Sequence, residues 1–180
     1  MLTSKASIGR FARSATRVLD DFLAGCVVIM MLAIVVQVFC STFDLNPVAV
    51  FDRAYFVVGS AITLNTLLDF QWHLLVAIGL LPAGFVWLRD RHVRVDFLYS
   101  SFSEKTKGRV DLCGNLVFGA PFLVMIIPAT WDFAGRAFRS GERGTNGGLA
   151  DLWVVKGILF VGFCLLALAV LVESYKLVRR

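Results

Sequence analysis

The chain has 180 residues, of which 58% are hydrophobic and 17% charged, with a mean hydropathy of +0.76. Soluble domains carry about 25% charged residues, so this composition excludes an ordinary soluble domain. The net charge is +5. The positions of the basic residues, between apolar segments, indicate membrane topology rather than binding to nucleic acid.

Four long apolar segments divide the chain and predict its fold. They cover about residues 22–43, 70–88, 110–131 and 152–173. A helix of about 20 residues rises roughly 30 Å, which matches the hydrocarbon thickness of a bilayer. We therefore predict an all-α integral membrane protein with four transmembrane helices, forming a single membrane domain over residues 1–180.

The lysines and arginines predict the orientation of these helices. Of the 18 basic residues, 13 precede the first segment, separate the second from the third, or follow the fourth. Such residues are retained on the cytoplasmic side during insertion. We expect both termini and the central loop to be cytoplasmic, with a minor contribution of the basic residues to binding of anionic membrane lipids.

The connection over about residues 48–66 is too polar to span a membrane and too apolar for a free loop. Phe51, Tyr55, Val58 and Ile62 recur at helical spacing. This pattern predicts an amphipathic helix lying in the membrane interface between the first and second spans.

Two further local features predict details of the spans. Gly79 and Ala83 have the spacing that allows close helix approach, and Pro82 between them should kink the second span. Ser103 and Thr106 predict a helix that begins before the third span. Tryptophans favour the interface, so we expect anchoring by the tryptophans near the span ends. These are Trp72, Trp87, Trp131 and Trp153.

The residues that membrane enzymes and redox carriers need are missing. Two-haem bundles use pairs of axial histidines, whereas this chain has only His73 and His92, which are predicted on opposite sides of the membrane. No Cys-x-x-Cys pair, metal cluster or phosphate loop occurs, so we expect no cofactor and no catalysis. Lys156, about one turn into the fourth span, is the ionisable group least easily explained by a position at a helix end.

The order of elements and several motifs resemble a transporter family. These motifs are Gln71-Trp72-His73-Leu74-Leu75, His92-Val93-Arg94-Val95-Asp96-Phe97, Lys107-Gly108-Arg109-Val110-Asp111-Leu112, and Gly147-Gly148-Leu149 with Trp153 and Lys156. Together they resemble the small permease subunit, the DctQ-like or Q subunit, of tripartite ATP-independent periplasmic (TRAP) transporters. The chain departs from the family in having Asp69 as its nearest acidic residue before the second span, where many members carry Glu, and in a longer first connection.

The resemblance implies a small scaffold subunit in a bacterial inner membrane. It would pack against a large permease subunit that moves as an elevator, while a periplasmic solute-binding protein delivers an organic acid and a sodium gradient supplies energy. The candidate residues for partner contact or loop ordering are then His92, Arg94, Asp96, Trp72, His73 and Lys156. Among these, we expect Arg94 and Asp96 to order or dock the central loop.

Two other functions remain open at this point. One is a membrane anchor subunit of a respiratory or redox complex, against which the missing histidines count. The other is a small transporter or channel that works as a homo-oligomer. No charged residue lies near mid-membrane, which argues against the second for charged solutes.

Overall fold

The structure is a computed structural model that describes residues 2–89, 97 and 99–179. Within this part of the chain, four helical segments are long and apolar enough to cross a membrane. They are Arg17–Thr42, Leu64–Leu88, Glu104–Ser140 and Trp153–Val178. The predicted all-α fold with four transmembrane helices is confirmed.

The chain divides into two compact units. Unit 1 contains residues 1–78 and 144–150, and unit 2 contains residues 79–143 and 151–180. The connection between the last two spans therefore contributes its middle to unit 1 and its ends to unit 2. The grouping of all 180 residues into a single membrane domain stays a prediction.

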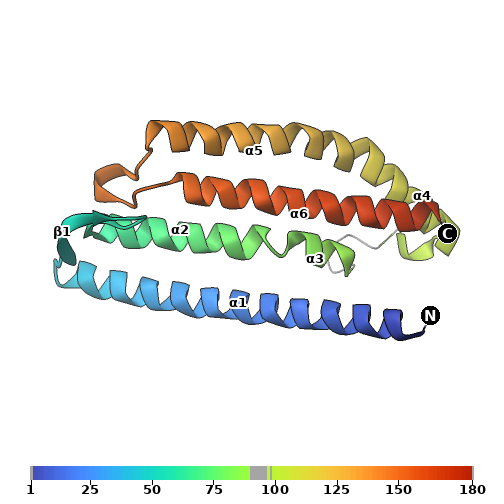
Figure 1. Cartoon of the computed structure of the whole chain (residues 1–180), viewed down its shortest axis with the longest axis horizontal. Coiled ribbons are helices and arrows are strands. Elements are labelled where there is room, and N and C mark those ends of the chain that lie inside the picture. The colour runs from blue at the N-terminus through green and yellow to red at the C-terminus, as the bar shows by residue number, and fades with distance from the viewer. Residues whose placement is uncertain (1, 90–96, 98, 180) are drawn as a thin grey trace. The chain divides into compact units, whose positions relative to one another are not determined.

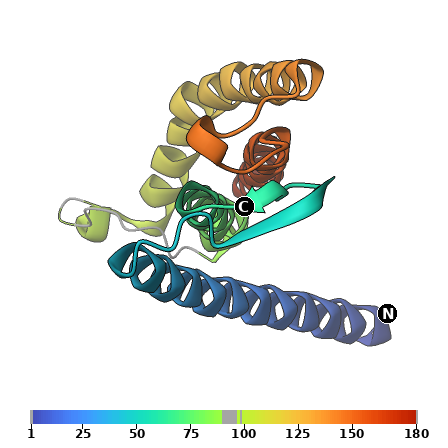
Figure 2. The same cartoon turned by 90° about the vertical axis from the view of Figure 1, so that its left-hand side faces the viewer.

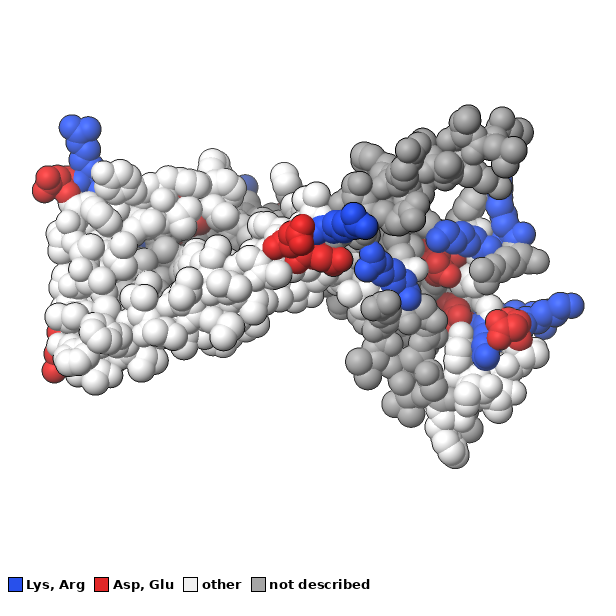
Figure 3. All heavy atoms as spheres, turned by 90° about the horizontal axis from the view of Figure 1, so that it is seen from below, with Lys and Arg blue, Asp and Glu red and all other residues white. Residues whose placement is uncertain are grey.

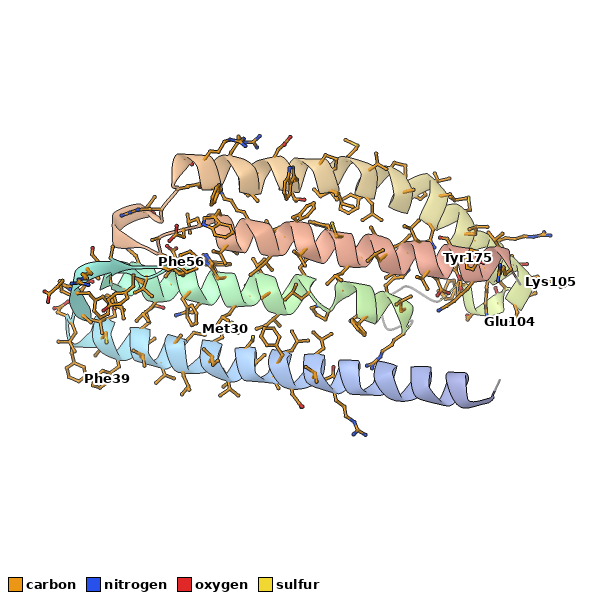
Figure 4. The ribbon with its side chains drawn as sticks, viewed as in Figure 1. Met30, Phe39, Phe56, Glu104, Lys105 and Tyr175 are labelled. Carbon is orange, nitrogen blue, oxygen red and sulfur yellow. The ribbon has the colours of Figure 1, made fainter. Side chains whose placement is uncertain are left out.

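Unit 1 is built from helix α1 (Leu2–Thr42), a two-stranded hairpin and most of helix α2 (Leu64–Leu80). Only 6% of the most apolar window of α1 is buried. Met30 and Phe39 project from opposite sides of α1 in Figure 4, and Phe39 is 57% exposed. Most of the surface of residues 17–42 is thus available to lipid tails or to another protein.

Strands β1 (Ala49–Tyr55) and β2 (Gly59–Ile62) occupy the connection between the first two spans. They pair antiparallel, with Ala49 opposite Ile62 and Tyr55 opposite Gly59. Figures 1 and 2 show this hairpin at the N-terminal end of α2.

The predicted interfacial helix over residues 48–66 is therefore wrong. The apolar spacing that suggests a helix runs across a chain reversal, since Phe51 and Tyr55 belong to β1 whereas Ile62 belongs to β2. The segment is rich in valine and aromatic residues, which favour strands over helices. Gly59, at a φ of 77°, supplies the left-handed conformation that the turn requires.

Unit 2 is centred on helix α6 (Trp153–Val178). The short helix α3 (Ala83–Leu88) and the long helix α5 (Ala120–Ser140) both pack on α6, and Figures 1 and 2 show α5 and α6 side by side. Helix α4 (Glu104–Gly114) precedes α5, after a single 3₁₀ turn at Tyr99–Ser101. In the most apolar window of α6, 22% of the residues are buried, the largest share among the four spans.

Close contacts in unit 2 depend on two glycines. A Cβ atom at Gly84 would lie 2.7 Å from the carbonyl oxygen of Leu165, and one at Gly162 would overlap the side chain of Leu80. The break between α2 and α3 falls at Leu81 and Pro82, as the proline predicts. A Cβ at Gly79 would meet no atom within 4 Å among the described residues, so close helix approach at Gly79 stays a prediction.

A wide π turn (Asn115–Gly119) joins α4 to α5, where the Ala120 amide donates to the carbonyl of Asn115. Pro121 follows directly, and its ring would crowd a regular turn, so the wider turn relieves that clash. The buried Asn115 side chain donates from Nδ2 to Ser174 Oγ on α6 at 3.1 Å. This polar contact ties the bend to α6.

Figure 3 shows the distribution of charge on one face of the molecule. Charged side chains gather in a few places, and uncharged surface separates those at the left end of the view from those near its middle. Such uncharged surface suits lipid tails or an apolar protein partner.

Candidate functional site

Several long-range hydrogen bonds lie near the hairpin that connects the first two spans. Because four spans alternate in direction, the connection between α5 and α6 reaches this same side of the membrane. We call it the hairpin side. It is defined by chain connectivity alone.

Asp69 on α2 holds the connection over residues 144–150. Its Oδ2 atom accepts a hydrogen bond from the backbone amide of Leu149 at 3.0 Å. A Cβ atom at Gly144 or Gly148 would overlap this carboxylate oxygen. Leu149 is only 2% exposed, so the contact fixes a buried residue. The glycines are required here by the close approach of the loop to Asp69.

Two threonines at the start of α2 hold the same loop. Thr63 and Thr66 each donate from Oγ1 to the carbonyl oxygen of Gly147, at 2.7 and 2.9 Å. The amide of Thr66 also donates to Thr63 Oγ1, and the amide of Thr63 to Thr66 Oγ1, both at 3.1 Å. This reciprocal pattern satisfies backbone donors at the helix start, as a capping box does.

The hairpin turn adds a third attachment. Val57 accepts a hydrogen bond on its carbonyl oxygen from the amide of Ala150 at 2.7 Å. Val57 has a φ of 68°, which is rare and unfavourable for a β-branched residue. We call Asp69, Thr63, Thr66 and Val57, together with residues 144–150, the loop anchor.

Lys156 lies in unit 2, in the first turn of α6. Its Nζ atom is 2.5 Å from Glu142 Oε2 and 3.9 Å from the centroid of the Phe133 ring. The residue is 9% exposed. The charge that the sequence leaves unexplained is thus neutralised within the chain. A role for Lys156 in partner contact stays a prediction.

Trp72 and His73 lie on α2 in different environments. Trp72 is 58% exposed. His73 is half-buried, and its Nδ1 atom donates to the carbonyl oxygen of Asp69 at 2.6 Å. Its Nε2 atom is buried and has no hydrogen-bond partner within the described residues. Contact of either residue with a partner stays a prediction.

An amide pair joins α1 to α2 inside unit 1. Gln71 Nε2 donates to Gln37 Oε1 at 2.6 Å. Such side-chain hydrogen bonds between transmembrane helices contribute about 0.6 kcal/mol on average. The pair is the clearest specific contact between α1 and the rest of unit 1.

Part of the predicted central-loop site, namely His92, Arg94 and Asp96, lies outside the described residues. Just after it, Tyr99 donates from its hydroxyl to Asp111 Oδ2 at 2.6 Å. Ser103 caps α4, because its Oγ atom accepts from the amide of Thr106. The predicted helix start is confirmed at these residues.

Among the predicted tryptophan anchors, Trp153 begins α6 and Trp87 lies next to the end of α3, whereas Trp131 lies in the interior of α5. Trp131 is 62% exposed and packs against Phe160 at a ring-centroid distance of 5.1 Å. Trp153 meets Phe138 edge to face at 5.4 Å. Trp87 lies in α3 and is half-buried. Their interfacial role stays a prediction.

Within the described residues, no group of three or more His, Cys, Asp or Glu side chains could hold a metal ion. The geometry there is that of helices and a loop fixed to one another by polar contacts. A sequence model of the family described as "Tripartite ATP-independent periplasmic transporters, DctQ component" matches residues 48–180. The chain belongs to this family.

No curated protein and no solved structure gives a significant match to the chain. The region matched by the DctQ family includes the hairpin, the loop anchor and all of unit 2, but not α1. This DctQ-family protein is thus a transporter component, namely the small permease subunit of a TRAP transporter, with membrane-spanning helices.

Sequence reasoning missed most of the loop anchor. The predicted third span ends at residue 131, whereas α5 continues to Ser140, and Asp69 is placed only by comparison with the family. A signal was available in the glycines at 144, 147 and 148, since glycines in a short connection often mark a close approach of backbone to another group. The partner of that approach, eighty positions earlier, carries no local signal.

Proposed function

We propose that this DctQ-family subunit is a scaffold, without a substrate site of its own, for a sodium-driven TRAP transporter of an organic acid. It packs against a large permease subunit in the bacterial inner membrane. A periplasmic solute-binding protein delivers the solute to the assembled pair. Both termini lie in the cytoplasm, which places the hairpin side in the periplasm.

The family membership carries this proposal, and the exposed surface of the spans supports it. Only 6% of the most apolar window is buried in the first span, and 11% in each of the second and third. Spans with so little internal contact have large faces left for lipid and for a larger protein. A scaffold also needs rigidity, which the loop anchor and the Lys156–Glu142 pair supply.

The experiment is solute uptake into proteoliposomes. Vesicles would contain the large permease subunit alone, this subunit alone, or both, with the solute-binding protein added outside. We expect sodium-dependent uptake of an organic acid only when both membrane subunits are present. Uptake by the large subunit alone at the full rate, or uptake by this subunit alone, would contradict the proposal.

A further inference from the structure

An exposed stripe runs along α5 on the side away from its buried residues. Leu123, Thr130 and Ala137, spaced seven apart, form the buried side of the helix. Successive members of the exposed stripe are three or four residues apart. Its members within α5 are Pro121, Met125, Pro128, Asp132, Arg136 and Arg139.

The stripe changes from apolar to basic near the end of the helix. Met125 is 75% exposed, which indicates a surface made for an apolar environment. Beyond Asp132, the stripe carries Arg136 and Arg139, and Arg143 is exposed shortly after the left-handed Gly141 ends the helix. We call Arg136, Arg139 and Arg143 the arginine row.

The arginine row has no counter-ion among the described residues. The ion pairs in the described part of the chain involve Lys107, Lys156 and Lys176 instead. The carboxylate of Glu142, adjacent to Arg143, is bound to Lys156. Asp132 is the one acidic residue of the described stripe, and it lies one turn before Arg136. The face therefore keeps an excess of positive charge that an external anion would neutralise.

The depth of Arg136, the first residue of the row, matches a lipid headgroup. Trp131 is 62% exposed and stands at the end of the apolar segment, where tryptophans mark the membrane interface. At 1.5 Å per residue, Arg136 lies about 7.5 Å further along the axis. The interfacial layer is roughly 5–8 Å thick on each side, so the guanidinium of Arg136 reaches the depth of lipid phosphates.

We propose that the arginine row binds the phosphate of an anionic phospholipid whose acyl chains lie along the apolar part of the same stripe. Guanidinium groups bind phosphate oxygens through paired, charge-assisted hydrogen bonds. The continuity of the basic row with the apolar surface at Met125 favours a lipid over an acidic protein surface, because a lipid presents its anion and its tails in that order. The site does not depend on which solute the transporter carries.

The test uses the subunit purified in its native complex, stripped of lipid in detergent and titrated with phosphatidylglycerol. Bound lipid is counted by native mass spectrometry, with phosphatidylcholine as the zwitterionic comparison. The test variant combines Arg136→Gln, Arg139→Gln and Arg143→Gln. The control variant removes three exposed charges from the other end of unit 2, through Lys105→Gln (labelled in Figure 4), Arg109→Gln and Lys176→Gln.

We expect the test variant to bind phosphatidylglycerol at least about tenfold more weakly, and the control variant to lose no more than about twofold in affinity. A third variant with lysine at the three positions should keep most of the affinity, which separates lost charge from misfolding. Unchanged affinity in the glutamine variant would overturn the proposal. So would an equal loss in the control variant, or loss of a co-purifying protein with lipid binding intact, which would assign the row to an acidic protein surface.

Discussion

The carboxylate of Asp69 and the amide of Leu149, 80 residues apart in the sequence, are joined by a 3.0 Å hydrogen bond. This contact fixes the connection before the last span against the start of the second. Gly144 and Gly148 allow it by leaving room for the carboxylate. The loop anchor is therefore a set of long-range contacts on the hairpin side.

Replacing Asp69 with alanine should release the loop. A hydrogen bond to a charged group contributes about 1.5–3 kcal/mol, and we expect a loss of that size in the free energy of unfolding. Asp69→Asn keeps an acceptor oxygen and should lose less. Thermal unfolding in detergent measures the loss, and the rate of tryptic cleavage after the exposed Arg143 reports loop release. Asp52→Ala, at an exposed carboxylate of β1, is the matched control, and equal effects of the two alanine variants would exclude a special role for Asp69.

Adding a methyl group at Gly148 should have a related effect. The Cβ atom would overlap the Asp69 carboxylate and approach the Gly144 Cα to 3.1 Å, so Gly148→Ala should cost about 1–3 kcal/mol. In the double variant Asp69→Ala/Gly148→Ala, the total loss of stability should be smaller than the sum of the two single losses, because the clash with the Asp69 carboxylate disappears. Gly157→Ala, at a glycine with open space around it, serves as the control. Strict additivity in a double-mutant cycle would show that the two residues do not interact.

The sequence is sufficient to predict the spans because hydropathy acts over whole segments. The cap at Ser103 and the break at Pro82 were also predictable, since each follows from the chemistry of one residue and its neighbours. The hairpin was not predictable from spacing, because Phe51, Tyr55, Val58 and Ile62 satisfy a helical period while a reversal at Val57 separates them.

Contacts between distant segments were the least predictable. Gly79 and Gly84 lie in the same span, yet only Gly84 contacts Leu165. Which of the two glycines makes this contact depends on how α3 packs on α6. Lys156 carries no sequence signal of its partner, because Glu142 belongs to a connection whose path is set by tertiary contacts. Such pairs require the three-dimensional arrangement.

The contact at Gly84 predicts sensitivity to a single methyl group. Gly84→Ala would place a Cβ 2.7 Å from the Leu165 carbonyl oxygen, so α3 must move away from α6 at a cost of about 1–3 kcal/mol. Gly79→Ala, with open space around it, should be neutral or raise stability by up to about 1 kcal/mol. Thermal unfolding of both variants in the same detergent makes the comparison. The same change in melting temperature for both would show that the close approach is not formed.

Removing Glu142 and removing Lys156 from their ion pair should cost different amounts of stability. Glu142→Gln leaves the cation of Lys156, whose side chain is 11% exposed, without its partner. Lys156→Met leaves Glu142, which is 41% exposed and can be hydrated. We expect the glutamine variant to lose more stability, by about 1 kcal/mol or more, since an unpaired buried charge costs more than an exposed one. The exposed pair of Glu104 and Lys107 gives the control, where Glu104→Gln should change stability by less than about 1 kcal/mol. A larger loss in Lys156→Met would contradict this account.

The most direct test of the scaffold function is purification of the tagged subunit from its native membrane in mild detergent, followed by mass spectrometry of the proteins that accompany it. We predict a single large polytopic membrane protein in about equal amount, because the face of α1 left exposed in this chain is extensive. Recovery of the chain alone as a homo-oligomer, or together with haem-bearing or dehydrogenase subunits, would contradict the account.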